Sequence, residues 1–160
     1  MKFKLLFSYR FLLFILSVLG VYLQLTKHGG FGMMLYYTIL SNMLVMFFMG
    51  DMVWRMLRGR STQTQSYLRM KGAVTMAIMI TFVIYHFMLA PLATPEKFYR
   101  LENFLCHYIV PLMFFFDTLV IDKAKQYRKL DPFLWTLIPL AYMLFALLNG
   151  LVLKWPIPGA

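Results

Sequence analysis

Five long apolar blocks, separated by short polar stretches, constrain the fold of this chain more than any other feature. They run from about Phe11 to Leu25, Met33 to Leu57, Gly72 to Leu92, Asn103 to Ile121 and Phe133 to Leu153. A membrane-spanning helix needs about 20 mainly apolar residues. We therefore expect the first helix to start near Leu5, with Arg10 reaching the membrane surface or paired inside. The blocks predict an all-α, polytopic transmembrane helix bundle, with residues 1–160 forming a single domain.

Composition and charge support a membrane protein over a soluble one. The chain is 61% hydrophobic and 14% charged, whereas soluble domains are about 45–50% apolar and about 25% charged. A net charge of +10 would indicate nucleic acid in a soluble protein, but here the basic residues lie between apolar blocks. In that position they set topology and meet anionic lipid headgroups. We expect membrane lipids, and no nucleic acid, as partners; the single cysteine excludes an internal disulfide.

The basic residues are distributed unequally between the two sides of the predicted bundle. One side carries twelve: Lys2, Lys4, Arg10, Arg55, Arg58, Arg60, Arg69, Lys71, Lys123, Lys125, Arg128 and Lys129. The other side carries four: Lys27, Lys97, Arg100 and Lys154. Lys and Arg accumulate in cytoplasmic loops, so this distribution predicts a multi-pass protein of the cell membrane with its N-terminus in the cytoplasm. The basic N-terminus resembles a signal peptide, but no small-residue cleavage site follows, and we expect the first helix to be retained.

Polar side chains from four of the blocks fall at a similar depth in the outer half of the bundle. Polar groups inside membrane segments are costly and usually face the protein interior or a cavity. At 1.5 Å per residue, Thr38 lies about 8 Å in from Met33, and His107 lies about 6 Å below Asn103. The pattern predicts a pocket, open toward the outer leaflet, lined by Thr38, Ser41, Asn42, His86, Asn103, His107, Tyr142 and Asn149.

The pair formed by Thr38 and His107 is suited to nucleophilic acyl transfer. A hydroxyl is a weak nucleophile, and a neutral imidazole can remove its proton as the oxygen attacks. Asp117 is about 15 Å from His107 along the helix axis and cannot orient the ring. Asn103 or Asn42 could do so, and either amide could instead donate to an oxyanion.

Other interpretations of the same residues stay open. The cluster could be interhelical hydrogen bonding in a non-enzymatic lipid-binding or transport protein. His86 and His107 could bind haem, but a zinc site would need three or four ligands, and we expect no metal and no cofactor. Three threonines, Thr75, Thr81 and Thr118, are expected to bond back to their own helices.

Two carboxylates on the cytoplasmic side have a structural interpretation. Asp51 and Asp117 lie near the bases Arg10, Arg55 and Lys71 in the predicted bundle. Charges inside a membrane segment usually pair with one another. We expect ion pairs in preference to a proton relay.

From Thr38 onward the chain resembles a known family. The order T-x-L-S-N from Thr38, Y-H at residues 85–86, H-Y-x-V-P-L from His107 and P-L-A-Y from Pro139 is similar to the FAR-17a/androgen-induced-protein-like family, and more closely to its bacterial six-transmembrane relatives. Animal members are membrane hydrolases that cleave fatty acid esters of hydroxy fatty acids with a threonine nucleophile and a histidine. The resemblance places these two roles on Thr38 and His107. It therefore implies a threonine-type carboxylic ester hydrolase acting on a fatty acid ester. It also implies a sixth span, so these 160 residues are expected to lack a final C-terminal helix.

Overall fold

The computed structural model describes residues 2–159, which contain helices and connecting loops but no strand. Five helical segments in this range are long and apolar enough to cross a membrane: Phe3–His28, Tyr37–Leu57, Gln65–Leu92, Leu101–Ile121 and Asp131–Leu153. The all-α class is therefore confirmed, and the five apolar blocks correspond to five helical segments of membrane-spanning length.

Several of these segments are built from more than one kind of helix. The α-helices are α1 (Phe3–His28), α2 (Tyr37–Leu57), α3 (Gln65–Ile84), α4 (Pro95–Phe98), α5 (Leu101–Phe104), α6 (Val110–Phe116), α7 (Asp131–Trp135) and α8 (Leu137–Leu148). Wider π-helical turns cover Tyr85–Leu89, Leu105–Ile109, Asp117–Ile121 and Asn149–Leu153. Tighter 3₁₀ turns cover Gly30–Leu35 and Ala90–Leu92.

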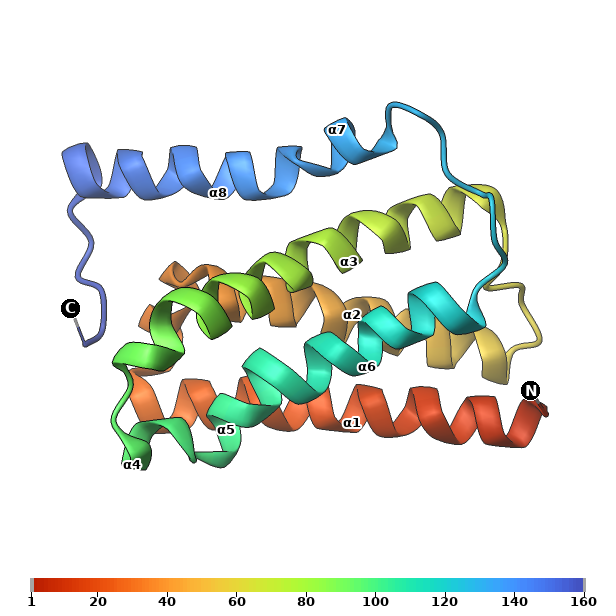
Figure 1. The fold of residues 1–160 in the computed structure, drawn as a ribbon, viewed down its shortest axis with the longest axis horizontal. Helices are drawn as coiled ribbons and strands as arrows, with labels where there is room; N and C mark the ends of the chain where they lie inside the picture. The colour runs from red at the N-terminus through yellow and green to blue at the C-terminus, as the bar shows by residue number, and fades with distance from the viewer. Residues whose placement is uncertain (1, 160) are drawn as a thin grey trace.

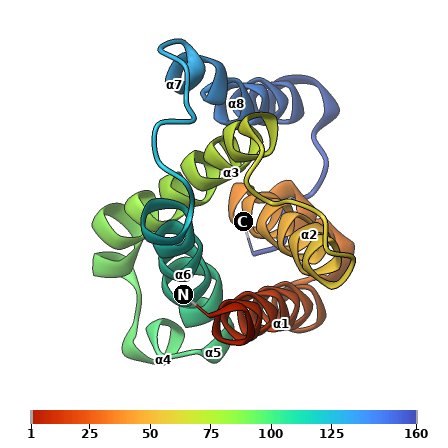
Figure 2. The same ribbon diagram turned by 90° about the vertical axis from the view of Figure 1, so that its right-hand side faces the viewer.

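Helices α1, α2, α3 and α6 form the core of the molecule, and α7 and α8 lie outside it, against α3 (Figure 1). The end-on view in Figure 2 shows the same arrangement. No residue of α8 is buried. The central apolar cluster draws on the four core helices and comprises Leu13, Val45, Met49, Met52, Tyr67, Val74, Ile78, Val110 and Phe114.

A buried ion cluster ties three core segments together at the end where α1 begins. Asp117 pairs with Arg10 at 2.9 Å and also with Lys71. Asp122 pairs with Arg10 at 3.2 Å and with Lys71 at 2.6 Å. The side chains of these four residues are at most 2% exposed. Asp51 pairs with Arg55 at 2.7 Å on the surface, so both expected carboxylate pairings are confirmed.

The third span starts earlier than expected. Its helix begins at Gln65, whereas the sequence predicted a polar loop up to Lys71 and a helix from Gly72. The expectation failed because Lys71 and Arg69 find carboxylate partners, Asp117 and Asp131. A paired charge can be buried where an unpaired one cannot.

The glycine-rich connection after α1 also differs from the prediction. The second span was expected from Met33, but Gly30–Leu35 forms a 3₁₀ turn and α2 begins at Tyr37. Gly29 ends α1 with φ of 143°, a conformation that favours glycine. A Cβ on Gly29 would lie 2.7 Å from Pro158, so the C-terminal segment packs closely on this turn.

The fifth span starts with Pro132 as its second residue and is interrupted at Thr136, between α7 and α8. Pro139 has no N–H to offer the carbonyl four residues earlier, that of Trp135. At the interruption the backbone N–H of Thr136 bonds to the carbonyl three residues earlier, that of Phe133, at 3.2 Å. The interruption therefore has a local cause in the sequence.

Candidate functional site

The structure brings the side chains of Thr38 and His107 together near the end of the bundle opposite the ion cluster. Thr38 is the second residue of α2, and His107 lies in the π-helical turn between α5 and α6. The Thr38 Oγ1 atom is 3.5 Å from Nε2 of His107. His107 is 8% exposed, so the pair is largely shielded by protein.

Proline shapes the backbone that carries His107. Pro111 cannot donate to the carbonyl four residues earlier, which is that of His107. The helix widens here into the π-helical turn Leu105–Ile109 before α6 continues. A second π-helical turn, Tyr85–Leu89, follows α3 at the same site. Such turns often occur at functional sites because they redirect side chains that a regular helix would place elsewhere.

A hydrogen bond to the backbone determines which ring nitrogen of His107 carries the hydrogen and which keeps a free lone pair. The Nδ1 atom is 3.0 Å from the backbone carbonyl oxygen of Asn103. A carbonyl oxygen can only accept, so Nδ1 carries the hydrogen. In the neutral ring Nε2 is then the basic nitrogen, and it is the atom that faces the Thr38 hydroxyl. The sequence left the side-chain amides of Asn103 and Asn42 as candidates for orienting the ring, and in the structure the backbone carbonyl of Asn103 does so.

Both expected amides are occupied elsewhere. Asn42 Nδ2 donates to the carbonyls of Thr38 at 2.8 Å and Cys106 at 3.0 Å. It therefore links α2 to the residue beside His107. Asn103 Nδ2 donates to the Tyr85 hydroxyl at 2.6 Å and to the carbonyl of Phe98 at 2.9 Å. Neither amide has a hydrogen left for an oxyanion.

Tyr85 completes the immediate surroundings of His107. Its ring stacks on the imidazole with centroids 3.8 Å apart and an interplanar angle of 25°. Stacking of this kind buries the faces of both rings and fixes the plane of the imidazole. Tyr85 is buried, so His107 is held by a backbone bond at its edge and a stacked ring on its face.

Ser41 and Thr81 form a second hydroxyl pair beside Thr38. Ser41 donates to the Thr38 carbonyl at 3.1 Å, and its oxygen lies 2.6 Å from Thr81 Oγ1. Thr81 thus bonds to another helix, which differs from the expected bond to its own backbone. Thr75 and Thr118 do bond back to their own helices, at 2.8 Å to Lys71 and 3.1 Å to Phe114.

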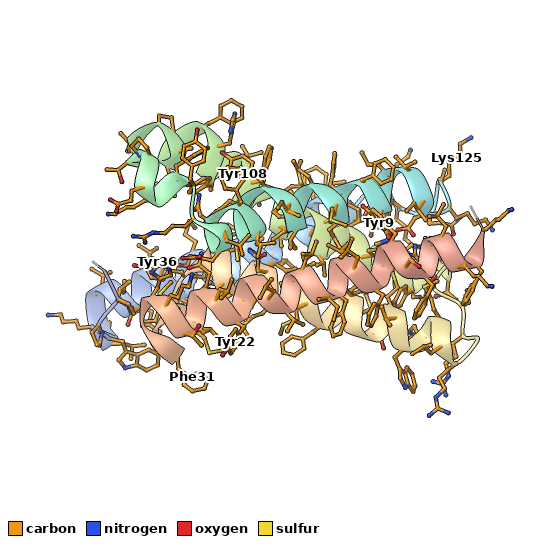
Figure 3. The ribbon with its side chains drawn as sticks, turned by 90° about the horizontal axis from the view of Figure 1, so that it is seen from below. Tyr9, Tyr22, Phe31, Tyr36, Tyr108 and Lys125 are labelled. Atoms are coloured by element: carbon orange, nitrogen blue, oxygen red, sulfur yellow. The ribbon has the colours of Figure 1, made fainter. Side chains whose placement is uncertain are left out.

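Thr38 lies on the wall of an apolar cavity of about 300 Å³ between α2, the end of α3 and α8. The lining residues carry no charge and comprise Tyr36, Tyr37, Thr38, Ile80, Thr81, Ile84, Tyr85, Leu89, Pro139 and Tyr142. Figure 3 shows Tyr36 at one end of the molecule and Lys125 at the opposite end. The cavity is therefore remote from the basic loops, and its walls suit a neutral, apolar ligand.

Two predicted site residues lie elsewhere. His86 is exposed, and its Nδ1 is 3.1 Å from the hydroxyl of Tyr108. Asn149 is buried, but its side chain bonds to the backbone of Trp155, at 3.0 Å from the amide nitrogen, and thereby holds the turn after α8. Tyr142 and Ser41 are placed near Thr38 as expected: Tyr142 lines the cavity.

The prediction missed Tyr85, although the sequence holds a signal for it. Tyr85 follows Thr81 by four residues and Ile78 by seven, which places all three on one face of a helix. That face is the buried one. His86, the next residue, lies on the exposed face of the helix. Of the pair Tyr85–His86, the sequence-based prediction therefore chose the residue that faces away from the site.

The two histidines of the haem alternative have separate surroundings, one exposed beside Tyr108 and one buried beside Thr38. Between residues 2 and 159, no group of three or more His, Cys, Asp or Glu side chains is arranged to hold a metal ion.

Comparison of the chain with models of known protein families, with curated proteins and with solved structures found no match.

Proposed function

We propose that this protein is an integral membrane lipid-ester hydrolase, with Thr38 as nucleophile and His107 as general base. One observation carries the proposal: the Thr38 hydroxyl faces the unprotonated Nε2 of a histidine whose Nδ1–H is held by a backbone carbonyl. A nucleophile beside a base that is itself oriented by a third group is the arrangement that activates a hydroxyl. The 3.5 Å separation is long, as is common before a ligand tightens such contacts.

The reaction follows from this geometry. As Thr38 Oγ1 bonds to the ester carbonyl carbon, its proton passes to Nε2 of His107, and the carbonyl electron pair moves onto the carbonyl oxygen. Collapse of this intermediate breaks the bond to the alcohol oxygen, which takes the proton from His107 and leaves. Water then attacks the acyl-threonine, giving up a proton to His107. Release of the fatty acid returns that proton to Thr38.

The cavity supports a lipid substrate. Its apolar walls and lack of charge suit an acyl chain next to the ester group. An acyl chain is already dissolved in the membrane, so the substrate enters from the bilayer. Membership of the FAR-17a/androgen-induced-protein-like family belongs to this proposal, because the family's threonine and histidine fall on Thr38 and His107. Fatty acid esters are the substrate class that it implies.

The proposal includes a location for the site. The basic end of the bundle faces the cytoplasm with the N-terminus, and the cavity then lies in the outer half of the cell membrane. Single cysteines in a Cys106→Ala background test this orientation with a membrane-impermeant maleimide on intact cells. Thr94→Cys should be labelled and Ser61→Cys protected; the reverse pattern contradicts the orientation.

A fluorophosphonate probe tests the nucleophile on purified protein in detergent. Wild type should be labelled, and Thr38→Ala and His107→Ala should not. Thr26→Ala and His86→Ala are the matched controls, because Thr26 bonds only to its own helix and His86 lies outside the cavity. Both controls should label like wild type.

A non-enzymatic lipid-binding or transport protein is the alternative function, and the same apolar cavity supports it. Folded wild-type protein that reacts with neither the probe nor an acyl ester, yet retains a lipid through purification, would favour this alternative. Loss of that lipid in Ile84→Trp, which fills the cavity, would place the binding site there.

A further inference from the structure

The cavity contains several hydroxyl groups, and their hydrogen bonds show which of them can serve a ligand. Three tyrosines donate their protons to backbone carbonyl oxygens: Tyr36 to Pro158, Tyr37 to Ala77 at 2.9 Å and Tyr142 to Leu35 at 2.8 Å. A hydroxyl has one hydrogen, so these three groups have none left to donate.

The hydroxyls of Ser41 and Thr81 are committed in the same way. Ser41 donates its hydrogen to the Thr38 carbonyl. The short contact between the two hydroxyls must then use the hydrogen of Thr81. Ser41 could donate to a ligand only by giving up its bond to the Thr38 carbonyl within α2, and Thr81 only by breaking the bond that joins α3 to α2.

Tyr85 is different because its oxygen is the acceptor. The amide nitrogen of Asn103 can only donate, so the 2.6 Å contact uses a lone pair of the Tyr85 hydroxyl and leaves its hydrogen available. Within residues 2–159 the Tyr85 hydroxyl donates no hydrogen bond, and the Asn103 amide is its one partner. A hydroxyl that accepts one hydrogen bond becomes a stronger donor in another, because the chain of bonds is mutually polarising. Among the cavity's hydroxyls, apart from the nucleophile, Tyr85 alone keeps its proton for a ligand.

We infer that Tyr85 is a further catalytic residue, whose hydroxyl donates a hydrogen bond to the carbonyl oxygen of the bound ester as negative charge develops on it. This inference rests on the proposed hydrolase function. Tyr85 lines the same cavity as Thr38, and its ring stacks on His107, so nucleophile, base and donor belong to one constellation. The Asn42 and Asn103 amides, which the sequence offered as oxyanion donors, are both occupied. Donors preorganised where charge develops act most strongly in a site with little water.

Tyr85→Phe tests the inference because phenylalanine keeps the stacked ring and removes only the hydroxyl. Hydrolysis of a p-nitrophenyl acyl ester by purified protein in detergent should show kcat falling by about 10²–10³, the usual effect of losing one oxyanion donor, with KM nearly unchanged. Tyr108→Phe is the matched control: its hydroxyl contacts His86 outside the cavity, and its kcat should equal that of wild type.

The outcomes separate the inference from the function on which it rests. Hydrolysis by Tyr85→Phe at the wild-type rate overturns the role of Tyr85 and leaves Thr38 and His107 standing. A higher KM with unchanged kcat makes Tyr85 a binding group and also overturns the inference. Absence of any wild-type turnover overturns the hydrolase proposal itself. Thermal unfolding is the control for folding: if Tyr85→Phe unfolds at the wild-type temperature, a lower kcat is not caused by a loss of fold. If Tyr85→Phe is unfolded, Tyr85→Trp, which also lacks the phenol hydroxyl, replaces it in the assay. A Tyr85→Trp variant that is folded and active contradicts the inference.

Discussion

Arg10 and Asp117 form a two-bond ion pair inside the bundle, with Nε and Nη2 of the guanidinium 2.9 and 3.0 Å from the two carboxylate oxygens. The pair joins α1 to the end of the fourth span across 107 residues of sequence. Lys71 approaches the same carboxylate from α3. Through its ion pairs with Arg10 and Lys71, Asp117 therefore connects its own helical segment to α1 and α3.

Replacement of Asp117 by Asn should destabilise the fold strongly, because it leaves Arg10 and Lys71 with too little negative charge in a buried site. Removing one partner of a buried ion pair typically costs about 3–5 kcal/mol. Unfolding of purified protein in detergent measures the change. Asp51→Asn is the control: the Asp51–Arg55 pair is on the surface, and its loss should change stability far less. Equal effects of the two substitutions would contradict a structural role for the buried cluster.

Asn42→Ala should lower both stability and activity. Its amide bridges the carbonyls of Thr38 and Cys106, and loss of a buried hydrogen-bond partner costs about 1–3 kcal/mol. The bridge also sets the spacing between Thr38 and His107, so labelling by the fluorophosphonate probe should slow. Asn149→Ala, which removes the bonds to Trp155, should affect stability but not labelling. Wild-type labelling of folded Asn42→Ala would show that the bridge does not position the pair.

Gly20 permits close approach of α1 to the turn that carries His107. A Cβ there would lie 3.1 Å from Cys106 Sγ and 3.3 Å from Leu105 Cβ. Gly20→Leu should therefore push this turn outward, costing about 1–3 kcal/mol and reducing hydrolysis. The same change at Gly150, where a Cβ would meet no atom within 4 Å, should have little effect on either. Thermal unfolding and ester hydrolysis, measured for both variants, check this prediction.

Cys106 should be inert toward maleimide in the folded protein and react fully after denaturation. It is the only cysteine in the chain, and it is 0% exposed. Mass spectrometry before and after addition of dodecyl sulfate measures the modification. Ser61→Cys, at an exposed position, should add one label to the folded protein. Rapid labelling of Cys106 without denaturant would contradict the packing of α1 against the turn at 105–109.

The large features of this protein follow from its amino-acid sequence alone. Apolar blocks long enough to cross a bilayer predicted five helices, because a chain in lipid must satisfy its backbone polar groups within each span. The helical rise per residue was enough to predict Thr38 and His107 at one depth. Pro111 and Pro139 marked where helical hydrogen bonding would change, because proline has no N–H.

The assembly of the site, in contrast, depends on the tertiary structure. Sequence periodicity tells which residues share a helix face, but not how each helix is rotated against its neighbours. That rotation turned His86 outward and Tyr85 inward, and it left Asn149 to hold the C-terminal turn. The group that orients His107 is the backbone carbonyl of Asn103, and every residue carries such a carbonyl. A pattern of side chains cannot identify which carbonyl accepts this hydrogen bond, because the position of the carbonyl depends on the path of the backbone through the π-helical turn.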